Sequence, residues 1–222
     1  MSTFVIYNSV NANSNKIGNE AFQSFSQYEG WDPVLWDGCT PHMLPWYRDK
    51  YEITAGNRTK KYANEKIRQN KESCFFSHYS VWELCANNNE TAIIVEHDTI
   101  CNQDFILPDL DWDTALGVQL TTQSMLQHLH HYNKYQKQLN SKGDGIHQVF
   151  YTHTYGMTTF AGGTGYMLSA KACQWLVEDC RKNGWCQNDM LFTDQDFPLY
   201  YVYPSPVEYI RSKELKSSSR GW

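Results

Sequence analysis

A short apolar run near the middle of the chain constrains the fold more than any other feature. Residues 92–95 read Ala-Ile-Ile-Val, are mostly β-branched, and follow a run of asparagines. A run of this length without polar alternation is typical of a strand buried on both faces. Strands of this kind occur where helices cover both sides of a mostly parallel sheet. The run therefore predicts a central strand in an α/β domain.

The order of elements near the N-terminus supports the same fold class. Residues 3–9 and residues 32–38 read as strands, and apolar residues recur at helical spacing over 15–30 between them. A strand–helix–strand order predicts parallel neighbours in one sheet. For a chain of 222 residues, we expect a single α/β domain over 1–222, with a mostly parallel twisted sheet flanked by helices.

The rest of the chain is divided by the same criteria. We expect a flexible basic tail over 211–222, which holds four Lys or Arg residues. The other expected elements are a polar loop over 8–15, irregular chain over 39–60, a helix over 70–89, a strand within 113–120, a strand and helix over 163–184 capped by Ser169 and Gly184, and a last strand within 198–207.

Three polar residues, Glu96, His97 and Asp98, follow the central strand directly. In open α/β sheets, ligands bind at the carboxyl ends of the strands. Alternate side chains of an extended chain share a face, so we expect Glu96 and Asp98 to point the same way and His97 to point away. Two carboxylates suit Mn²⁺ or Mg²⁺, which also binds diphosphate. The pattern favours a metal site on Asp98 and Glu96, although polar residues also simply end many strands.

Charge and cysteine usage exclude some classes of protein. The formal net charge is -5, so the whole chain is not a polycation built for nucleic acid. Basic residues do gather over 48–71, where they either bind phosphate groups or form a solvated helix face. The 7 cysteines are scattered without a CxxC pair, which indicates reduced, packing thiols and a cytoplasmic protein. There is no signal-like N-terminus and no apolar run long enough for a membrane span.

Two stretches carry a resemblance to a known family. In the first, Cys74, Ser77-His78 and Trp82 precede the aliphatic strand and Glu96-His97-Asp98. The second stretch is residues 163–207. It contains, in order, Tyr-Met-Leu-Ser-x-x-Ala, "CQNDML" and "YYVYPSPV". The chain resembles glycosyltransferase family 25, the lipooligosaccharide and collagen galactosyltransferase type, over most of its length.

Two departures from the family pattern stand out. The family has Glu-Asp-Asp after the strand, and His97 replaces the middle acid here. A Gly-Glu-x-Gly run before the family cysteine is here Asn-Lys-Glu-Ser, residues 70–73. The first departure keeps both outer acids, whereas the second puts the geometry of a donor-binding loop in doubt.

The resemblance implies a GT-A fold and transfer of a sugar from a nucleotide-diphosphate sugar to a hydroxyl acceptor, assisted by Mn²⁺ or Mg²⁺. Asp98, with Glu96, would hold the cation and stabilise the charge that develops on the diphosphate. Asp189 would act as the general base on the acceptor side, or else cap a turn. The candidate donor-binding residues are Tyr7, Asn8, Glu96, Ser77, His78 and Gly163. Tyr7 would stack on the base or else be an ordinary core or surface tyrosine, and Gly163 would let the backbone approach the donor or else only form a turn.

Several histidines and two other functions stay open at this point. His78 is either a packing residue or a group that bonds near the acids, and His97, His153 and the cluster His128, His130 and His131 are candidates for a third metal contact. The Asn-, Gln- and Tyr-rich texture also suits a virus-encoded enzyme that glycosylates hydroxylated bases in DNA, located in the host cytoplasm. The third reading is a non-catalytic carbohydrate- or partner-binding module on the same fold, with no membrane span.

Overall fold

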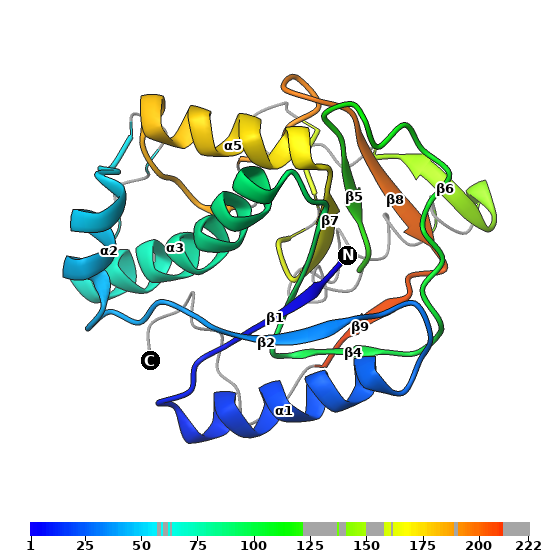
Figure 1. Ribbon diagram of the computed structural model, residues 1–222, viewed down its shortest axis with the longest axis horizontal. Coiled ribbons are helices and arrows are strands. Elements are labelled where there is room, and N and C mark those ends of the chain that lie inside the picture. Colours follow the sequence, from blue (N-terminus) through cyan, green and yellow to red (C-terminus); the bar gives the residue numbers. More distant parts are fainter. Residues whose placement is uncertain are drawn as a thin grey trace.

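A seven-stranded sheet forms the centre of the molecule in the computed structural model (Figure 1). The structure describes residues 1–56, 59, 62, 64–121, 137, 141–149, 158–160, 162–188 and 191–210. The strand order in the large sheet is β2-β1-β3-β7-β5-β8-β6, and β4 pairs with β9 in a separate two-stranded sheet. The strands are β1 (Thr3–Tyr7), β2 (Pro33–Asp37), β3 (Ala92–Glu96), β4 (Thr99–Cys101), β5 (Gly117–Gln119), β6 (Gly145–Gln148), β7 (Gly165–Leu168), β8 (Leu199–Tyr203) and β9 (Val207–Tyr209). The helices are α1 (Ala12–Ser26), α2 (Leu44–Tyr51), α3 (Glu65–Asn88) and α5 (Ala170–Asn183).

The α/β class is confirmed, but the sheet is mixed. Strand β1 runs parallel to β2 and β3, and β5 runs parallel to β8. Strand β7 runs antiparallel to both β3 and β5, and β6 runs antiparallel to β8. The expected parallel arrangement therefore holds in the β2-β1-β3 half. Because β7 is antiparallel, it begins at the same edge of the sheet where β3 ends.

Helices cover both faces of the sheet, which explains why the central strands lack polar alternation. Alternate residues such as Ile94 and Tyr166 pack into the core under α3 and α5. Their neighbours Ile93 and Met167 pack into a second core with α1 residues, including Phe25. Figure 1 shows α3 and α5 on one side of the strands and α1 on the other. A strand buried on both faces is apolar at every position.

Capping residues set the ends of three helices. The side chain of Asn11 accepts a hydrogen bond from Ser14 N, so α1 begins within the stretch expected to be a polar loop. Helix α3 likewise begins earlier than expected, behind the Asn64 cap. The caps at Ser169 and Gly184 of α5 are confirmed, because Ser169 accepts from Ala172 N and Gly184 N bonds Cys180 O.

The expectation of irregular chain over 39–60 is wrong, because α2 lies within it. Pro45 sits in the first turn of this helix, where the missing N–H has no intrahelical partner to lose. Tyr47 and Tyr51 then pack against Phe76 of α3. This aromatic packing, and not a periodic pattern in the sequence, holds the short helix in place.

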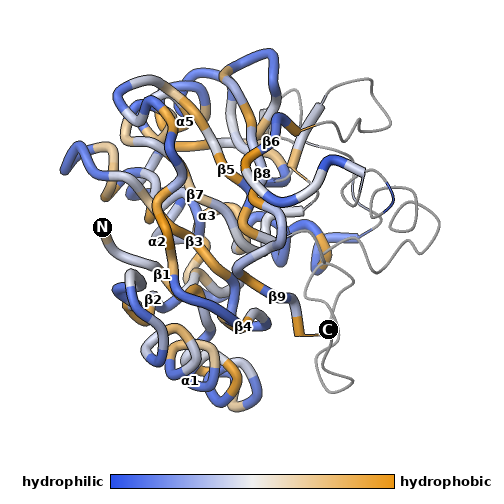
Figure 2. The backbone as a smooth tube through the Cα atoms, turned by 90° about the vertical axis from the view of Figure 1, so that its right-hand side faces the viewer, coloured by the Kyte–Doolittle hydropathy of each residue, from blue (hydrophilic) through white to orange (hydrophobic). Residues whose placement is uncertain are grey.

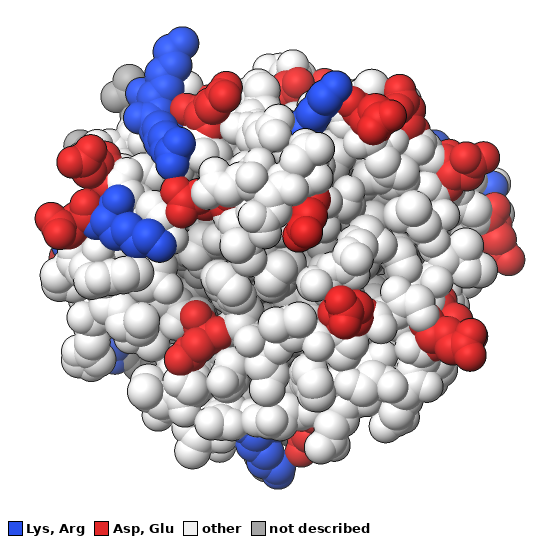
Figure 3. Space-filling model, viewed as in Figure 1, with Lys and Arg blue, Asp and Glu red and all other residues white. Residues whose placement is uncertain are grey.

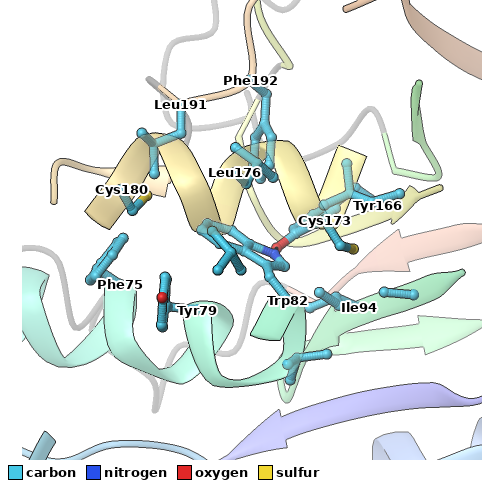
Figure 4. Close-up of a cluster of buried hydrophobic side chains, with 14 of the residues drawn as sticks. Phe75, Tyr79, Trp82, Ile94, Tyr166, Cys173, Leu176, Cys180, Leu191 and Phe192 are labelled. Atoms are coloured by element: carbon cyan, nitrogen blue, oxygen red, sulfur yellow. The ribbon is translucent and has the colours of Figure 1, made fainter. Parts of the chain in front are cut away.

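The core between α3 and α5 is mainly aromatic (Figure 4). Phe75, Tyr79 and Trp82 of α3 are all 0% exposed, and they lie beneath Leu176 and Cys180 of α5. Truncating a buried aromatic residue of this size to Ala costs about 3–5 kcal/mol. The packing fixes α3, and with it any side chain that α3 directs toward the edge of the sheet.

Hydrophobic stretches follow the strands through the middle of the molecule, and hydrophilic ones lie mainly in turns and on outer helix faces (Figure 2). Helix α1 shows both kinds along its length, as expected for a helix with one buried face. Among the described helices, none combines the length and the apolar character needed to cross a bilayer.

Candidate functional site

The tip of β3 is fixed to both neighbouring strands. Glu96 N donates to the carbonyl oxygen of Thr164 at 2.9 Å, just before β7. His97 N donates to the carbonyl oxygen of Ile6 in β1, also at 2.9 Å. The predicted acidic residues therefore lie at an edge where β1 and β3 end and β7 begins. This is the edge at which α/β sheets bind ligands.

The chain turns immediately after Glu96. The Thr99 hydroxyl donates to the Glu96 carbonyl oxygen at 2.7 Å, and Ile210 N donates to the Asp98 carbonyl oxygen at 2.7 Å. These bonds close a turn between β3 and β4 and attach it to the chain after β9. The strand alternation that motivated a shared face for the two acids therefore reaches Glu96 only.

Glu96 is held from behind by a chain of buried side chains. Its carboxylate oxygen Oε1 lies 3.3 Å from His78 Nε2, and His78 Nδ1 lies 2.7 Å from the Tyr166 hydroxyl. Trp82 Nε1 donates to the same hydroxyl at 3.0 Å (Figure 4). Burial alone would raise the pKa of Glu96, but the hydrogen bond from His78 Nε2, with smaller contributions from His97 and Lys71, brings it below its ordinary value.

Asp98 has the opposite environment. Its Oδ1 atom is buried and has no hydrogen-bond partner. Burial first, and then the charge of Glu96, raise the pKa of Asp98 well above its usual range, and a hydrogen bond from the Tyr209 side chain lowers it only partly. A buried carboxylate without full pairing is costly unless a proton or a cation compensates it.

These two carboxylates fit a hard divalent cation. Mn²⁺ and Mg²⁺ take carboxylate oxygens and leave other positions for water and phosphate. Asp98 offers an unpartnered oxygen, and Glu96 keeps 26% side-chain exposure although His78 binds it. A cation would relieve the mutual repulsion that raises the pKa of Asp98.

Sequence reasoning missed one potential ligand, Cys74. Among the described residues, Cys74, His78 and Glu96 form a group of three whose ligand atoms all lie within 4.8 Å of one another. Cys74 and His78 are four residues apart on α3, so they share one face of the helix. That Cys-x-x-x-His spacing on a predicted helix is the signal that could have found it.

At the tip of β1, the structure gives Tyr7 and Asn8 clear local roles. The Asn8 side chain accepts from Val10 N at 3.1 Å and from Asn11 N at 3.2 Å, which closes the turn into α1. A Cβ on Gly18 would lie 2.6 Å from Tyr7 Cβ, so only glycine lets the Tyr7 side chain rest on α1. Both residues stand at the binding edge, and their contact with a donor stays a prediction.

Ser77 and Gly163 occupy different surroundings. The Ser77 hydroxyl donates to Ser73 O and accepts from Cys39 N, both at 2.8 Å, so it ties α3 to the chain after β2. Among the described residues, a Cβ on Gly163 would meet only Asn188 Cβ, at 3.8 Å. The backbone at Gly163 is therefore open to close approach, as predicted for a donor-binding glycine, whereas Ser77 is buried.

The predicted base Asp189 lies outside the described residues. The same holds for His128, His130, His131 and His153, and for the tail 211–222. Asn188, directly before Asp189, donates through Nδ2 to the backbone oxygen and to the Sγ atom of Cys74, at 3.5 and 3.6 Å. The chain that leads into Asp189 is therefore anchored beside the group around Glu96.

The basic segment 48–71 is partly committed to an internal ion pair. Arg48 forms two bonds with the buried carboxylate of Glu72, at 2.6 and 2.7 Å, and Arg68 forms a third at 2.8 Å. On the face shown in Figure 3, Lys and Arg side chains are interspersed with Asp and Glu. Neither observation favours a surface that binds a phosphate backbone.

Known proteins resemble this chain to different degrees. The family model described as glycosyltransferase family 25 (LPS biosynthesis protein) matches residues 13–192. Comparison with curated protein sequences gives no match. Among solved structures, the galactosyltransferase LgtC in complex with donor and acceptor sugar analogs is similar at 9% identity with a TM-score of 0.46, over 100% of this chain and 92% of that one. So slight a structural likeness adds nothing to the argument.

The match to the family model identifies the family without the structural comparison. It covers most of the chain, from α1 to Phe192, and it includes α3, the acidic tip of β3 and the Tyr166 strand with α5. The resemblance inferred from the two sequence stretches is thereby confirmed. Because the match spans well over half of the chain, this protein belongs to glycosyltransferase family 25 and is an enzyme of glycosyl transfer.

Proposed function

We propose that the protein transfers a sugar from a nucleotide-diphosphate sugar to a hydroxyl group of a glycan acceptor, with Mn²⁺ or Mg²⁺ bound at the tip of β3. The observation that carries this proposal is the Asp98 carboxylate, whose Oδ1 atom is buried without a partner beside Glu96. A buried carboxylate oxygen without a partner is costly to the fold, and a bound cation would compensate it.

The two carboxylates would bind the cation in different ways. Asp98 supplies the oxygen that nothing else compensates, and Glu96 supplies an oxygen from a carboxylate that His78 orients. A bound cation would act as a Lewis acid toward the diphosphate leaving group. The backbone of Glu96 is bonded to Thr164 before β7 and that of Asp98 to Ile210 after β9, so the site would require little rearrangement when the donor binds.

The donor would lie along the edge formed by β1 and β7. Tyr7 presents an aromatic ring at the end of β1, which suits stacking on a nucleoside base. Asn8 shapes the turn that follows. The backbone at Gly163 would allow close approach of the sugar or its phosphates, because among the described residues only Asn188 Cβ lies within 4 Å of an added Cβ.

Proton removal from the acceptor hydroxyl falls to Asp189 in this proposal. A general base must reach the proton it accepts, within about 2.6–3.2 Å or through one water. The neighbouring Asn188 is anchored to Cys74 on α3, on the same side of the sheet as His78 and Glu96. Replacing Asp189 by Asn would lower kcat by about 10²–10⁴-fold if the carboxylate is this base.

A panel of nucleotide sugars tests the donor and the cation together. Melting temperatures are measured with each nucleotide sugar, with and without Mn²⁺. Ligand at 100 times its Kd adds about 2.7 kcal/mol of stability, so the correct donor stands out. We expect one donor to stabilise the protein strongly only when Mn²⁺ is present.

The variant Asp98→Asn tests whether Asp98 holds the cation. The exposed Asp109→Asn is its matched control, because it removes the same charge away from the proposed site. The Mn²⁺-dependent stabilisation should vanish in the first variant and persist in the second. If no nucleotide sugar stabilises the wild type, the proposal is wrong and a non-catalytic module becomes the better reading. If hydroxymethylated DNA binds with a steep salt dependence, the acceptor class is wrong.

A further inference from the structure

The second feature of the site is the buried chain of polar groups behind Glu96. It runs from Trp82 through Tyr166 and His78 to the Glu96 carboxylate, with separations of 3.0, 2.7 and 3.3 Å. Trp82 and Tyr166 are 0% exposed and His78 is 1% exposed. A buried polar network persists only when each of its members is satisfied, so the direction of every bond in it can be derived.

The two end groups of this hydrogen-bond network, Trp82 and Glu96, determine the position of every proton between them. Indole Nε1 of Trp82 can only donate, so the Tyr166 oxygen accepts there. The Tyr166 proton must then go to His78 Nδ1, which is the other hydrogen-bond partner of this hydroxyl among the described residues. His78 consequently carries its own proton on Nε2 and donates it to the Glu96 carboxylate, which can only accept.

The ring geometry and the state of the phenol agree with this direction. The His78 and Tyr166 rings stack with centroids 5.7 Å apart and planes 14° apart, which holds the imidazole in one orientation. Burial raises the pKa of Tyr166 well above its usual range, so the hydroxyl keeps the proton that it donates. An imidazolium would instead leave the Tyr166 proton buried and unpaired.

We propose that Trp82, Tyr166 and His78 form a one-directional hydrogen-bond relay whose function is to position Glu96 as a cation ligand. The proposal rests on the proposed function, because it assumes that Glu96 binds the donor's cation. Each of the three residues is a positioning residue that acts through Glu96. Outer partners of this kind commonly change metal affinity by about 10–100-fold when they are removed.

A rival interpretation uses the same atoms differently. Cys74, His78 and Glu96 offer a thiolate, an imidazole and a carboxylate within 4.8 Å, a donor set that suits Zn²⁺. Zinc would need a bare Nε2 on His78, and the proton would then move to Nδ1. Tyr166 would lose its acceptor in the process, because its oxygen already accepts from Trp82. The network therefore opposes the zinc site.

The proton position on His78 is the decisive measurement. Long-range ¹H–¹⁵N NMR of histidine-labelled, metal-free protein distinguishes a protonated Nε2 from a protonated Nδ1, and loss of the signals in His78→Gln assigns them. We expect Nε2 to be protonated and Nδ1 to be bare. A proton on Nδ1 would overturn the relay. Zn²⁺ binding that moves the Nε2 signal and disappears in Cys74→Ser would establish the rival site.

Metal affinity separates positioning from packing. We expect His78→Leu to weaken Mn²⁺ binding, followed by electron paramagnetic resonance, by about 10–100-fold. His78→Gln, which can still present an N–H toward Glu96, should recover most of the affinity, although it fills the space no better than leucine. Unchanged Mn²⁺ affinity in His78→Leu would overturn the positioning role.

A second pair of variants controls for damage to the core. Tyr166→Phe removes the hydroxyl of the relay, whereas Tyr79→Phe makes the same change at a buried tyrosine next to His78 in α3 that is outside the relay. We expect Mn²⁺ affinity to fall in Tyr166→Phe and to stay at the wild-type value in Tyr79→Phe. Equal losses in both would overturn the relay. If the wild type binds no Mn²⁺ while His78 keeps its Nε2 proton, the proposed function fails and the relay has only a structural role.

Discussion

Two buried carboxylates in this protein are treated in opposite ways. Glu72, where α2 meets α3, is 2% exposed and receives three short bonds from Arg48 and Arg68. Asp98, at the tip of β3, keeps a buried Oδ1 atom without any partner. Full pairing is what a fold needs when it buries a charge. The proposed cation would supply the pairing that Asp98 lacks.

The contrast predicts that removing the charge of Asp98 harms activity without harming the fold. In Asp98→Asn, we expect kcat for sugar transfer to fall by about 10²–10³-fold, the scale of one lost electrostatic group in an active site. The melting temperature of the metal-free protein should stay the same or rise, because the amide is not penalised by burial as a charge is. Initial rates and thermal denaturation measure the two effects. A variant that is fully active, or clearly less stable, would contradict the contrast.

The Glu72 side of the comparison is tested by Arg48→Met. This change leaves the buried Glu72 carboxylate with Arg68 as its remaining partner. It removes the two hydrogen bonds from Arg48, whose side chain is 39% exposed. We expect a loss of roughly 2 kcal/mol in the free energy of unfolding. Urea denaturation measures it, with the exposed Lys66→Met as the matched control. Transfer activity at saturating donor should be unaffected, and a selective loss of kcat would break the comparison.

The pH dependence of stability sharpens the contrast further. The pKa of Asp98 is raised above its ordinary value of 3.8, so the folded protein keeps a proton that the unfolded chain releases. This preferential protonation of folded Asp98 contributes stability that is fully present below pH 3.8 and is lost as the pH rises through the folded pKa. The free energy of unfolding falls over that range by at most about 1.4 kcal/mol per pH unit. The stability of Asp98→Asn relative to wild type should therefore increase with pH. Measurements above pH 4.5 avoid Glu96, whose lowered pKa acts in the opposite direction.

The smallest effect is expected for an exposed carboxylate. Glu65 pairs with Arg68, which lowers the pKa of Glu65, but its side chain is 59% exposed. Solvent screens such a pair and side-chain entropy opposes it. Glu65→Gln should leave the urea midpoint unchanged within error. A loss comparable to that of Arg48→Met would mean that the whole Arg68 network, and not burial of Glu72, determines stability.

Local signals made part of this fold predictable. The apolar run of β3 and the caps Ser169 and Gly184 could be read directly, because each depends on a few neighbouring residues. Helix α2 could not be predicted, since its stability comes from packing Tyr47 and Tyr51 on α3 and not from its own pattern. The antiparallel direction of β7 is a contact between segments about 70 residues apart, for which a single sequence gives no local signal.

In the site, too, only features that depend on neighbouring residues could be predicted. Glu96 and Asp98 could be singled out because they follow a buried strand. Their different surroundings could not, because His78, Tyr166 and Tyr209 reach them from other parts of the chain. The family resemblance placed His78 near the acids, but it gave neither the direction of the hydrogen bonds nor the bare oxygen of Asp98.

The contact between Gly18 and Tyr7 has a consequence for how specificity can change. Any side chain at position 18 would collide with Tyr7, since an added Cβ would lie only 2.6 Å from Tyr7 Cβ. Residue 18 belongs to α1, behind the edge where the donor would bind. If Tyr7 stacks on the donor as proposed, a substitution at Gly18 would change donor binding indirectly, by displacing the Tyr7 ring.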